Sequence, residues 1–462
     1  MGGHQIGLNK MGIFKAYDIR GVYPSELNEE IAYKIGRAFV SFLHCKEVVV
    51  GRDARSCSPQ LFEALADGIT DEGSDMIDIG LSTTPMLYYA GHGREAAIMI
   101  TASHNPKDHN GFKMCRRDSI PVSGDTGIKE IESLAGKNMF SKKTKGKIIK
   151  KDILDEYIDF NLGLMDRMAK DKLKRLPKKF TVVLDAANAM GSLDHPKVYE
   201  KLGCRLIKLY CDLDMTFPNH EANPLKHETL AVLQKTVVEN KADFGVAVDG
   251  DADRCVLVDE KGGIVSADLL TALIGKHIME KHPAAKILFD LRSSMAVKET
   301  IEKAGGKAIM CRVGHAFIKK QMKEEDALFA GELSGHFYYK EHFTTESTIL
   351  TVLKAIEIML EENKPLSELI KPLRKYYQSG EINFAVKDKE AKINELEQLF
   401  GRQKNAEVSH LDGISIDFGG WRLNVRPSNT ESLLRLNIEA KTKEKMEEMK
   451  EKLSSILSKG AP

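Results

Sequence analysis

Short apolar runs alternate with amphipathic stretches along most of the chain. Three segments share one order: a polar lead-in, an apolar strand, a small charged turn, a helix and a glycine before a second strand. They begin at 46-KEVVVGRDARS, 179-KFTVVLDAANAMG and 286-KILFDLRSS. Alternating strand and helix patterns predict parallel β-α-β units whose sheets are covered by helices. The recurrence of the pattern at roughly hundred-residue spacing indicates duplicated domains.

The C-terminal part of the chain follows a different pattern. A helix is predicted over 387–400, strands over 413–418, 421–425 and 433–440, and a charged amphipathic helix over 444–457. We therefore expect an α/β protein with three related mixed α/β domains and a smaller C-terminal α+β domain. The predicted domain boundaries give the ranges 1–155, 156–262, 263–375 and 376–462.

Composition narrows the class of protein. The chain has 462 residues, of which 42% are hydrophobic, enough to bury several cores. Its 68 Lys and Arg residues balance 67 Asp and Glu residues, so nothing predicts a nucleic acid or an anionic membrane as partner. The seven cysteines are scattered without a C-x-x-C pair, which is typical of reduced thiols in a cytoplasmic protein. No apolar run predicts a transmembrane helix or a signal peptide.

Three carboxylates alternate in 244-FGVAVDGDADRCVLVDE. On a strand, Asp249, Asp251 and Asp253 would crowd like charges on one face, but in a loop they can converge on a hard cation such as Mg²⁺. An EF-hand is disfavoured because Arg254 stands where that loop needs glycine and because the flanks are strand-like. A solvated acidic turn without metal is the other alternative. Arg254 would suit a phosphate beside the metal.

A serine follows another predicted strand, at 98-IMITASHNP. The apolar run predicts the end of a buried strand, and Pro106 keeps the following residues in a loop. Ser103 in that loop can be a turn former whose hydroxyl bonds nearby backbone. It can also be a nucleophile or an oxygen that carries a group, and the local pattern does not decide between these.

Two further polar motifs suit a sugar phosphate. In 331-GELSGH, Glu332, Ser334 and His336 alternate between glycines, and a carboxylate with a hydroxyl can bind sugar hydroxyls. In 426-RPSNTE, an arginine fork followed by hydroxyl and amide groups can cradle a phosphate; these residues are Arg426, Ser428, Asn429 and Thr430. An ordinary glycine-rich turn and a polar hairpin loop are the alternatives. His315 and Lys319 would share a helix face, which also suits a plain surface helix.

Taken together, the motifs TASHNP, DGDADR, GELSGH and RPSNTE, with 14-FKAYDIRG and 110-NGFK, resemble the α-D-phosphohexomutase superfamily. The resemblance is greatest to the phosphomannomutase/phosphoglucomutase group, and it spans the chain from Phe14 to beyond Glu431. It implies four domains around a central cleft. It also implies an intramolecular phosphotransferase that interconverts hexose 1-phosphate and hexose 6-phosphate, of mannose or glucose, through a hexose 1,6-bisphosphate.

The resemblance also implies roles for individual residues. Ser103 would carry the phosphoryl group and complete a Mg²⁺ site with Asp249, Asp251 and Asp253. Lys113 is the first candidate for the general acid and base, with Arg20 and His315 as alternatives. Glu332, Ser334, His336 and Tyr17 would contact the sugar. The phosphate contacts would come from Arg426, Ser428, Asn429, Thr430, Arg254 and Arg292.

One segment departs from the family pattern. After GELSGH the family commonly has paired aspartates, whereas this chain reads 342-HFTTESTIL. We expect Thr344 or Thr345 to cap the next helix, with Glu346 in its first turn. The departure leaves a phosphoglucosamine mutase open as an alternative, although Leu333 favours the mannose and glucose group. A metal-dependent sugar phosphatase is a further alternative, and the enzyme is expected to be a monomer or a homodimer.

Overall fold

The computed structural model describes residues 12–428 and 433–458. The chain divides into two compact units, Met1–Ser266 with Ser334–Glu368 and Ala267–Leu333 with Leu369–Pro462. The first unit therefore includes residues 334–368, which lie within the third predicted domain. Among the described residues, no helix has the length and apolar character needed to cross a membrane.

The first sheet has seven strands, of which the predicted β-α-β unit supplies β2 and β3. Its path is β1-β5-β4-β2-β3-β7, and β6 pairs with β5. The strands are β1 (Ile19–Val22), β2 (Glu47–Arg52), β3 (Asp75–Leu81), β4 (Ala96–Ile100), β5 (His109–Arg116), β6 (Ile120–Pro121) and β7 (Ile148–Lys150). β2 runs parallel to β3, as the repeat predicted, and also to β4, whereas β5 is antiparallel to β1 and β4.

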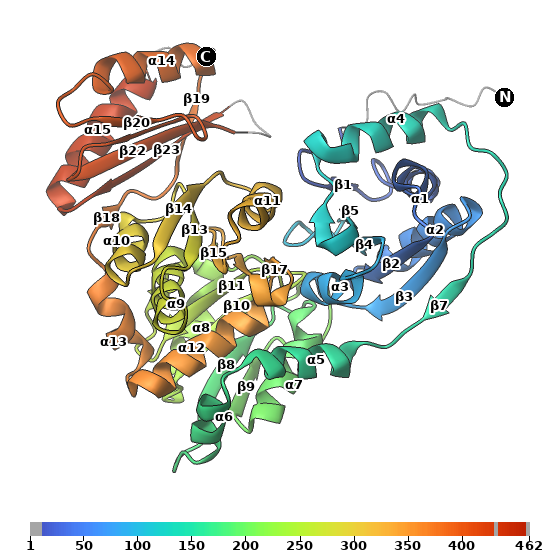
Figure 1. The fold of residues 1–462 in the computed structure, drawn as a ribbon, viewed down its shortest axis with the longest axis horizontal. Coiled ribbons are helices and arrows are strands. Elements are labelled where there is room, and N and C mark those ends of the chain that lie inside the picture. The colour runs from blue at the N-terminus through green and yellow to red at the C-terminus, as the bar shows by residue number, and fades with distance from the viewer. Residues whose placement is uncertain (1–11, 429–432, 459–462) are drawn as a thin grey trace. The chain divides into compact units, whose positions relative to one another are not determined.

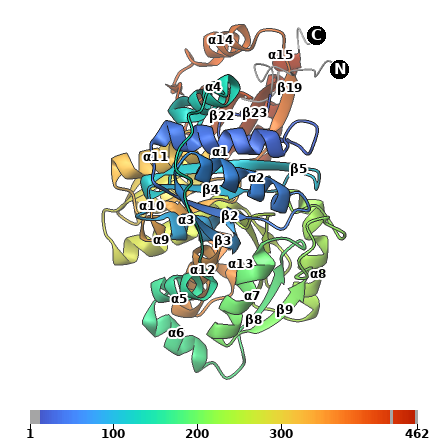
Figure 2. The same cartoon turned by 90° about the vertical axis from the view of Figure 1, so that its right-hand side faces the viewer.

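Helices cover both faces of this sheet. α1 (Glu29–Leu43), α2 (Ser58–Asp71) and α4 (Lys129–Lys137) share one apolar core with every second residue of the central strands, including Val48 and Val50. Figures 1 and 2 show α1 and α2 side by side on this face. α3 (Thr84–Gly91) packs against β2 and β4, and Thr83 caps it by accepting a hydrogen bond from the amide of Met86.

The second sheet, in the same unit, has the order β12-β11-β10-β8-β9. Its strands are β8 (Thr181–Asp185), β9 (Arg205–Leu209), β10 (Phe244–Val248), β11 (Cys255–Asp259) and β12 (Ile264–Val265). The helices of this part are α5 (Leu154–Leu164), α6 (Arg167–Lys174), α7 (Gly191–Leu202), α8 (Ala231–Glu239) and α12 (Thr348–Glu362). β8 and β9 are parallel, as predicted, whereas β10 and β11 form an antiparallel pair. The loop that connects β10 to β11 carries the three aspartates.

The segment that departs from the family pattern lies in this unit too. β16 (Phe337–Tyr339) and β17 (Thr345–Glu346) form an antiparallel hairpin. The predicted cap of the next helix is therefore wrong: Thr345 and Glu346 are strand residues, and α12 is capped instead by Ser347, whose side chain accepts from the amide of Leu350. The strand pairing takes up the residues expected to begin the helix.

The second unit contains the third β-α-β repeat and the C-terminal sheet. β13 (Lys286–Asp290) is parallel to both β14 (Lys307–Cys311) and β15 (Phe329–Gly331). The accompanying helices are α9 (Ala267–Lys281), α10 (Met295–Lys303) and α11 (His315–Glu325). The helix predicted to place His315 and Lys319 on one face is present, and it begins at His315. α13 (Leu366–Ile370) spans the point where the chain re-enters this unit.

The C-terminal sheet is antiparallel, as predicted, with the order β18-β23-β22-β21-β20 and β19 paired to β23. Its strands are β18 (Tyr377–Gln378), β19 (Ile382–Ala385), β20 (Glu407–Ser409), β21 (Ile414–Asp417), β22 (Trp421–Pro427) and β23 (Leu433–Ala440). α14 (Lys389–Phe400) and α15 (Lys443–Ser458) pack with these strands around a separate apolar core. The α+β class predicted for this part of the chain is confirmed.

Candidate active site

The serine loop, defined here as residues 101–109, connects β4 to β5. Ser103 lies in the left-handed region of backbone space with a φ of 52°, and its amide donates to Thr101 Oγ1 at 3.0 Å. The amide of Asn105 donates to the carbonyl of Ala102 at 3.0 Å. These contacts form a tight turn in which Ser103 is buried. Such strain in a non-glycine residue is a feature of functional loops.

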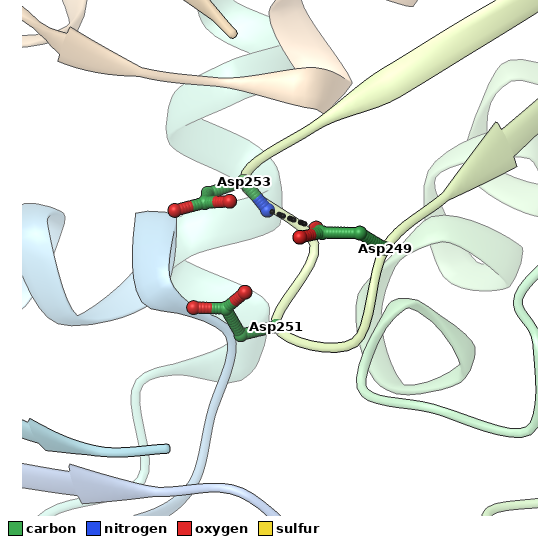
Figure 3. Close-up of side chains that lie close together, drawn as sticks. All are labelled: Asp249, Asp251 and Asp253. Atoms are coloured by element: carbon green, nitrogen blue, oxygen red, sulfur yellow. Dashed lines mark hydrogen bonds between the residues drawn. The ribbon is translucent and has the colours of Figure 1, made fainter. Parts of the chain in front are cut away.

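The metal loop, defined here as residues 249–254, connects β10 to β11. Because two strands flank it, the EF-hand alternative is wrong. Asp249 Oδ1 accepts from the amides of Asp253 and Arg254, each at 3.1 Å, so the loop folds back on its first carboxylate. The three aspartates are buried, and one oxygen from each lies within 4.8 Å of the others (Figure 3).

The serine loop and the metal loop meet. Ser103 Oγ donates to Asp249 Oδ2 at 2.9 Å, although the two residues are 146 positions apart in the sequence. The backbones also touch, because a Cβ placed on Gly250 would lie 2.1 Å from the Ser103 carbonyl oxygen. The predicted contact between a hydroxyl of the first domain and the acidic cluster of the second is therefore present.

The carboxylate oxygens of Asp251 and Asp253 differ in the hydrogen bonds that they accept. Asp251 Oδ2 accepts from Lys113 Nζ and Thr84 Oγ1, both at 2.5 Å, and Asp253 Oδ2 accepts from Lys113 Nζ at 2.6 Å. Asp251 Oδ1 is buried and accepts no hydrogen bond from the described residues, whereas Asp253 Oδ1 lies 3.4 Å from His336 Nε2. Buried carboxylate oxygens without donors are costly, and oxygen ligands are what a hard divalent cation takes. The cluster therefore fits a metal ion.

Burial and the charges within the cluster shift the pKa values of its side chains. Burial, with the neighbouring charges of Asp253 and Asp251, raises the pKa of Asp249 to about 7. Burial acts in the same direction on Asp253, but Lys113 and His336 outweigh it and hold the pKa of that carboxyl well below its usual range. Burial opposes the charged form of Lys113, but the carboxylates of Asp251 and Asp253 raise its pKa. Lys113 is thus a protonated bridge between two carboxylates.

An arginine from outside the serine loop contacts it, and a histidine lies within it. Arg20 Nη1 donates to Asn105 Oδ1 at 2.6 Å and to the carbonyl of Ala102 at 3.2 Å, and its Nε donates to Asp18. His104 Nδ1 lies 3.1 Å from Ser103 Oγ, and burial, together with the charges of Arg254 and Arg20, lowers the pKa of this histidine well below its usual value. Reasoning from sequence did not single out His104, although its place beside Ser103 was a signal.

The first unit holds further predicted site residues. Arg254 Nε donates to His336 Nε2 at 3.2 Å and lies 3.8 Å from Asp249 Oδ2. His336 Nδ1 lies 2.9 Å from Ser334 Oγ. Arg254 therefore links the predicted sugar motif to the metal loop. Tyr17 is half-buried in the turn before β1.

The second unit holds the other predicted residues. Arg292 Nη2 donates to Asp290 Oδ2 at 2.8 Å and to Glu332 Oε1 at 3.4 Å, and the amide of Gly314 donates to the same Glu332 oxygen at 3.3 Å. These contacts orient the Glu332 carboxylate at the end of β15. His315 is the next residue after Gly314.

The predicted phosphate loop begins at the end of β22, in the same unit. Arg426 is buried, and its Nη2 donates to Glu381 Oε2 at 2.8 Å. The amide of Ser428 donates to the carbonyl of Leu433 at 2.9 Å, which closes the base of the hairpin. Asn429 and Thr430 lie outside the described residues.

One residue of the site carried no distinct sequence signal. Thr84 donates from Oγ1 to Asp251 Oδ2, and its amide donates to the Asp251 carbonyl at 3.0 Å. In the sequence it is one of two threonines before Pro85, a common start of a helix. Only the packing of α3 against the metal loop gives it contact with a carboxylate.

Comparison with known proteins identifies the family of the chain. Four phosphoglucomutase/phosphomannomutase domain models match the chain: alpha/beta/alpha domain I over residues 11–142, domain II over 155–263, domain III over 266–377 and the C-terminal domain over 381–456. A phosphomannomutase of Vibrio cholerae is 40% identical, with 94% of this chain and 95% of that protein covered. A phosphomannomutase of Methanocaldococcus jannaschii is 39% identical, with 97% and 98% covered.

Solved structures share the whole fold. A phosphoglucomutase/phosphomannomutase family protein of Burkholderia thailandensis has a TM-score of 0.88 and 30% identity, with 96% of each chain covered. The fold also recurs, at a TM-score of 0.64 and 13% identity, in an Aspergillus fumigatus N-acetylphosphoglucosamine mutase whose structure contains GlcNAc-6P and magnesium; 98% of this chain and 97% of that one are covered.

The chain belongs to the phosphoglucomutase/phosphomannomutase family, a family of hexose-phosphate mutases. The predicted enzyme class, an isomerase that moves a phosphoryl group within a hexose phosphate, is confirmed, and so is the fold of three α/β domains and a C-terminal domain. The individual domain boundaries and the roles of the site residues stay predictions.

Proposed function

We propose that the chain interconverts the 1- and 6-phosphates of mannose and glucose through a phosphoryl group carried on Ser103. The observation that carries this proposal is the hydrogen bond from Ser103 Oγ to Asp249 Oδ2 at 2.9 Å, inside a cluster of three buried carboxylates. A serine that only shaped a turn would not need an acidic partner from another domain. The curated relatives named as phosphomannomutases support mannose as one of the sugars.

The proposed reaction is a reversible transfer in two halves. Phosphorylated Ser103 gives its group to the free hydroxyl of a hexose 1- or 6-phosphate. A bond from phosphorus to the sugar oxygen forms as the bond from phosphorus to Oγ breaks, a base takes the proton of the sugar hydroxyl, and Ser103 Oγ gains a proton. The resulting hexose 1,6-bisphosphate turns over, and its other phosphoryl group is transferred to Ser103 Oγ, whose proton passes to a base while an acid protonates the leaving sugar oxygen. The work of the protein is positioning and electrostatics.

We propose Mg²⁺ as the ion, because three carboxylates with further oxygen ligands suit it. Asp249, Asp251 and Asp253 would hold it, and it would neutralise charge on the transferring group. Around this site Arg20, Arg254 and Lys113 supply the positive charge that a phosphorylated serine requires. Arg20 and Arg254 are already fixed by hydrogen bonds to Asn105 and His336.

The acid and base are proposed among Lys113, Arg20 and His315. As a protonated bridge between Asp251 and Asp253, Lys113 can donate a proton to a leaving oxygen, whereas it must first lose one to act as a base.

Glu332 and Ser334 are proposed to bind sugar hydroxyls, with His336 and Tyr17 beside them. Arg292 and the loop of Arg426, Ser428, Asn429 and Thr430 are proposed to bind the phosphate that is not reacting. The oligomeric state and the cytoplasmic location stay predictions.

The decisive experiment is the intact mass of the protein before and after incubation with glucose 1,6-bisphosphate and Mg²⁺. We expect a gain of one phosphoryl group, mapped to Ser103 by peptide sequencing. A protein that isomerises hexose phosphates while its phosphoryl group maps elsewhere would contradict the proposal.

The sugar preference needs a separate assay. We expect mannose 1-phosphate and glucose 1-phosphate to be isomerised faster than glucosamine 1-phosphate when the three are compared at equal concentration. Faster turnover of glucosamine 1-phosphate would favour a phosphoglucosamine mutase. Release of inorganic phosphate at a rate comparable to isomerisation would favour a phosphatase.

Replacing Thr84 with valine is expected to weaken Mg²⁺ binding about tenfold, the lower end of the effect of removing a group that orients a metal ligand. Valine keeps the shape of threonine but removes the hydroxyl that ties Asp251 Oδ2. Among the described residues, Lys113 would then remain as the only donor to that oxygen. The measurement is the dependence of activity on Mg²⁺ concentration, together with direct titration by calorimetry.

The matched control is Thr84→Ser, which keeps the hydroxyl and should bind Mg²⁺ as the parent protein does. Thermal unfolding of both variants separates a positioning effect from a loss of fold. Equal Mg²⁺ affinity in the valine and serine variants would show that the Thr84 hydroxyl does not position Asp251.

A further inference from the structure

A completely buried arginine lies beneath the serine loop. Arg55 follows β2 in the turn before α2, and its side chain has no exposed surface. Neither the acidic cluster nor the predicted substrate motifs include it. A buried guanidinium is costly unless its donors are paired, so its partners indicate its purpose.

The partners of Arg55 are mainly carbonyl oxygens of the serine loop. Nη2 donates to Ser103 O and Asn105 O, both at 2.8 Å. Nη1 donates to Pro106 O at 2.5 Å and to His109 O at 3.1 Å. The fifth donor, Nε, bonds Asp53 Oδ2 at 3.2 Å.

All five N–H groups of the guanidinium are therefore used, and four of them hold backbone of the serine loop. The comparable arginine of the third repeat, Arg292, uses its side chain for the carboxylates of Asp290 and Glu332 instead. Asp53 in turn fixes Arg55, because its Oδ1 accepts from the Arg55 amide and the Ser58 hydroxyl.

The serine loop needs such a support. Ser103 has a left-handed backbone, which is unfavourable for a residue with a side chain. Its carbonyl oxygen also faces Gly250 of the metal loop at close range. A small rotation of the Ser103 peptide would move Oγ away from Asp249, and the bond from Arg55 to the Ser103 carbonyl opposes that rotation.

We propose that Arg55 is a positioning residue for the mutase reaction, which clamps the backbone of the serine loop so that Ser103 Oγ stays at the acidic cluster. The inference rests on the proposed role of Ser103 as carrier of the phosphoryl group. Arg55 does not touch the substrate. It acts through the loop, so its loss changes the rate of phosphoryl transfer and the mobility of residues 101–109 together.

The test compares the parent protein with Arg55→Lys. Lysine keeps the charge but is a point donor with three hydrogens, so it cannot hold four carbonyls at once. We expect Ser103 to gain its phosphoryl group from glucose 1,6-bisphosphate at least about tenfold more slowly, because small misplacements of reacting groups carry large rate costs. The amides of residues 101–109 should exchange with deuterium faster in the variant. The value of kcat should fall with little change in KM, since the loop backbone is not a substrate contact.

Arg52→Lys is the matched control. Arg52 lies on β2, its side chain donates to Asp78 and stacks over Phe62, and among the described residues this side chain makes no hydrogen bond to the serine loop. We expect its rate and its loop exchange to equal those of the parent. Arg55→Gln, which keeps two donors without charge, is a second variant that should be slower than Arg55→Lys, and thermal unfolding checks that both fold.

The outcomes separate the two proposals. Parent-like rate and loop exchange in both Arg55 variants would overturn the clamp. Slower transfer in Arg52→Lys to the same extent would also overturn it, because the effect would then follow from any change to this strand. A parent protein that gains no phosphoryl group on Ser103 would overturn the proposed function, while faster loop exchange in Arg55→Lys would still report the clamp.

Discussion

Replacing Ser103 with alanine is expected to lower mutase activity by at least about 10⁴-fold, within the range seen when an enzyme loses its nucleophile. The variant lacks the oxygen that would carry the phosphoryl group, and no other hydroxyl donates to Asp249 Oδ2 among the described contacts. The intact mass should no longer change on incubation with glucose 1,6-bisphosphate.

The same variant should keep its fold and its metal site. Asp249 Oδ1 is held by the amides of Asp253 and Arg254, and Lys113 holds the other two aspartates. Loss of the Ser103 hydroxyl costs about 1–3 kcal/mol of unfolding free energy, because the buried Asp249 Oδ2 loses its donor. The variant should therefore unfold cooperatively at a somewhat lower temperature and bind Mg²⁺ as the parent protein does, which assigns the lost activity to chemistry.

Ser82→Ala is the matched control for this experiment. Ser82 is buried in the same domain, and its hydroxyl contacts Met99 Sδ and not the serine loop or the carboxylates. We expect its activity to stay near that of the parent. Substantial isomerisation by Ser103→Ala would contradict both the mutase mechanism and a phosphatase that uses Ser103.

Gly250→Ala is expected to lower activity by at least about 100-fold, because a displacement on the order of 1 Å between reacting groups has this effect. The new Cβ would lie 2.1 Å from the Ser103 carbonyl oxygen and 2.9 Å from its carbon, closer than nonbonded atoms approach. To remove this steric clash, the metal loop and the serine loop must move apart. The hydrogen bond between Ser103 and Asp249 would then lengthen or break.

The change should also destabilise the protein by about 1–3 kcal/mol, the usual cost of an overpacked interior. Arg55 resists relief from the serine side, since it holds the Ser103 carbonyl at 2.8 Å. Activity, thermal unfolding and phosphorylation of Ser103 are the measurements. Gly163→Ala is the control: its Cβ would meet nothing within 4 Å, and it lies near the end of α5. Parent-like activity in Gly250→Ala would show that the two loops need not touch.

Much of the fold could be predicted because its signals are local. Strand and helix patterns in the three repeats predicted the parallel pairs β2–β3, β8–β9 and β13–β14. The helix cap after the GELSGH motif was predicted wrongly because a short hairpin precedes the helix. Thr345 pairs with Tyr339 across a hairpin, and that pairing moves the start of α12 to the cap at Ser347.

The acidic cluster could also be predicted from a local pattern in the sequence. Three aspartates at alternate positions in one short loop predicted a cation site, and the structure confirms their convergence. The serine motif was less informative by itself, since a serine after a strand is common. The motifs did indicate Lys113 and Arg20, but not that Lys113 bridges two of the aspartates.

By itself, the sequence determined the order of the elements, the domain classes and the chemical groups that the site contains, because propensity and hydrophobic period act over neighbouring residues. Only the tertiary structure decided which groups touch. Ser103 and Asp249 meet across 146 positions, Thr84 reaches Asp251 across 167, and Arg55 reaches Ser103 across 48. Such contacts depend on how separate sheets and helices pack, and no local pattern along the chain encodes that packing.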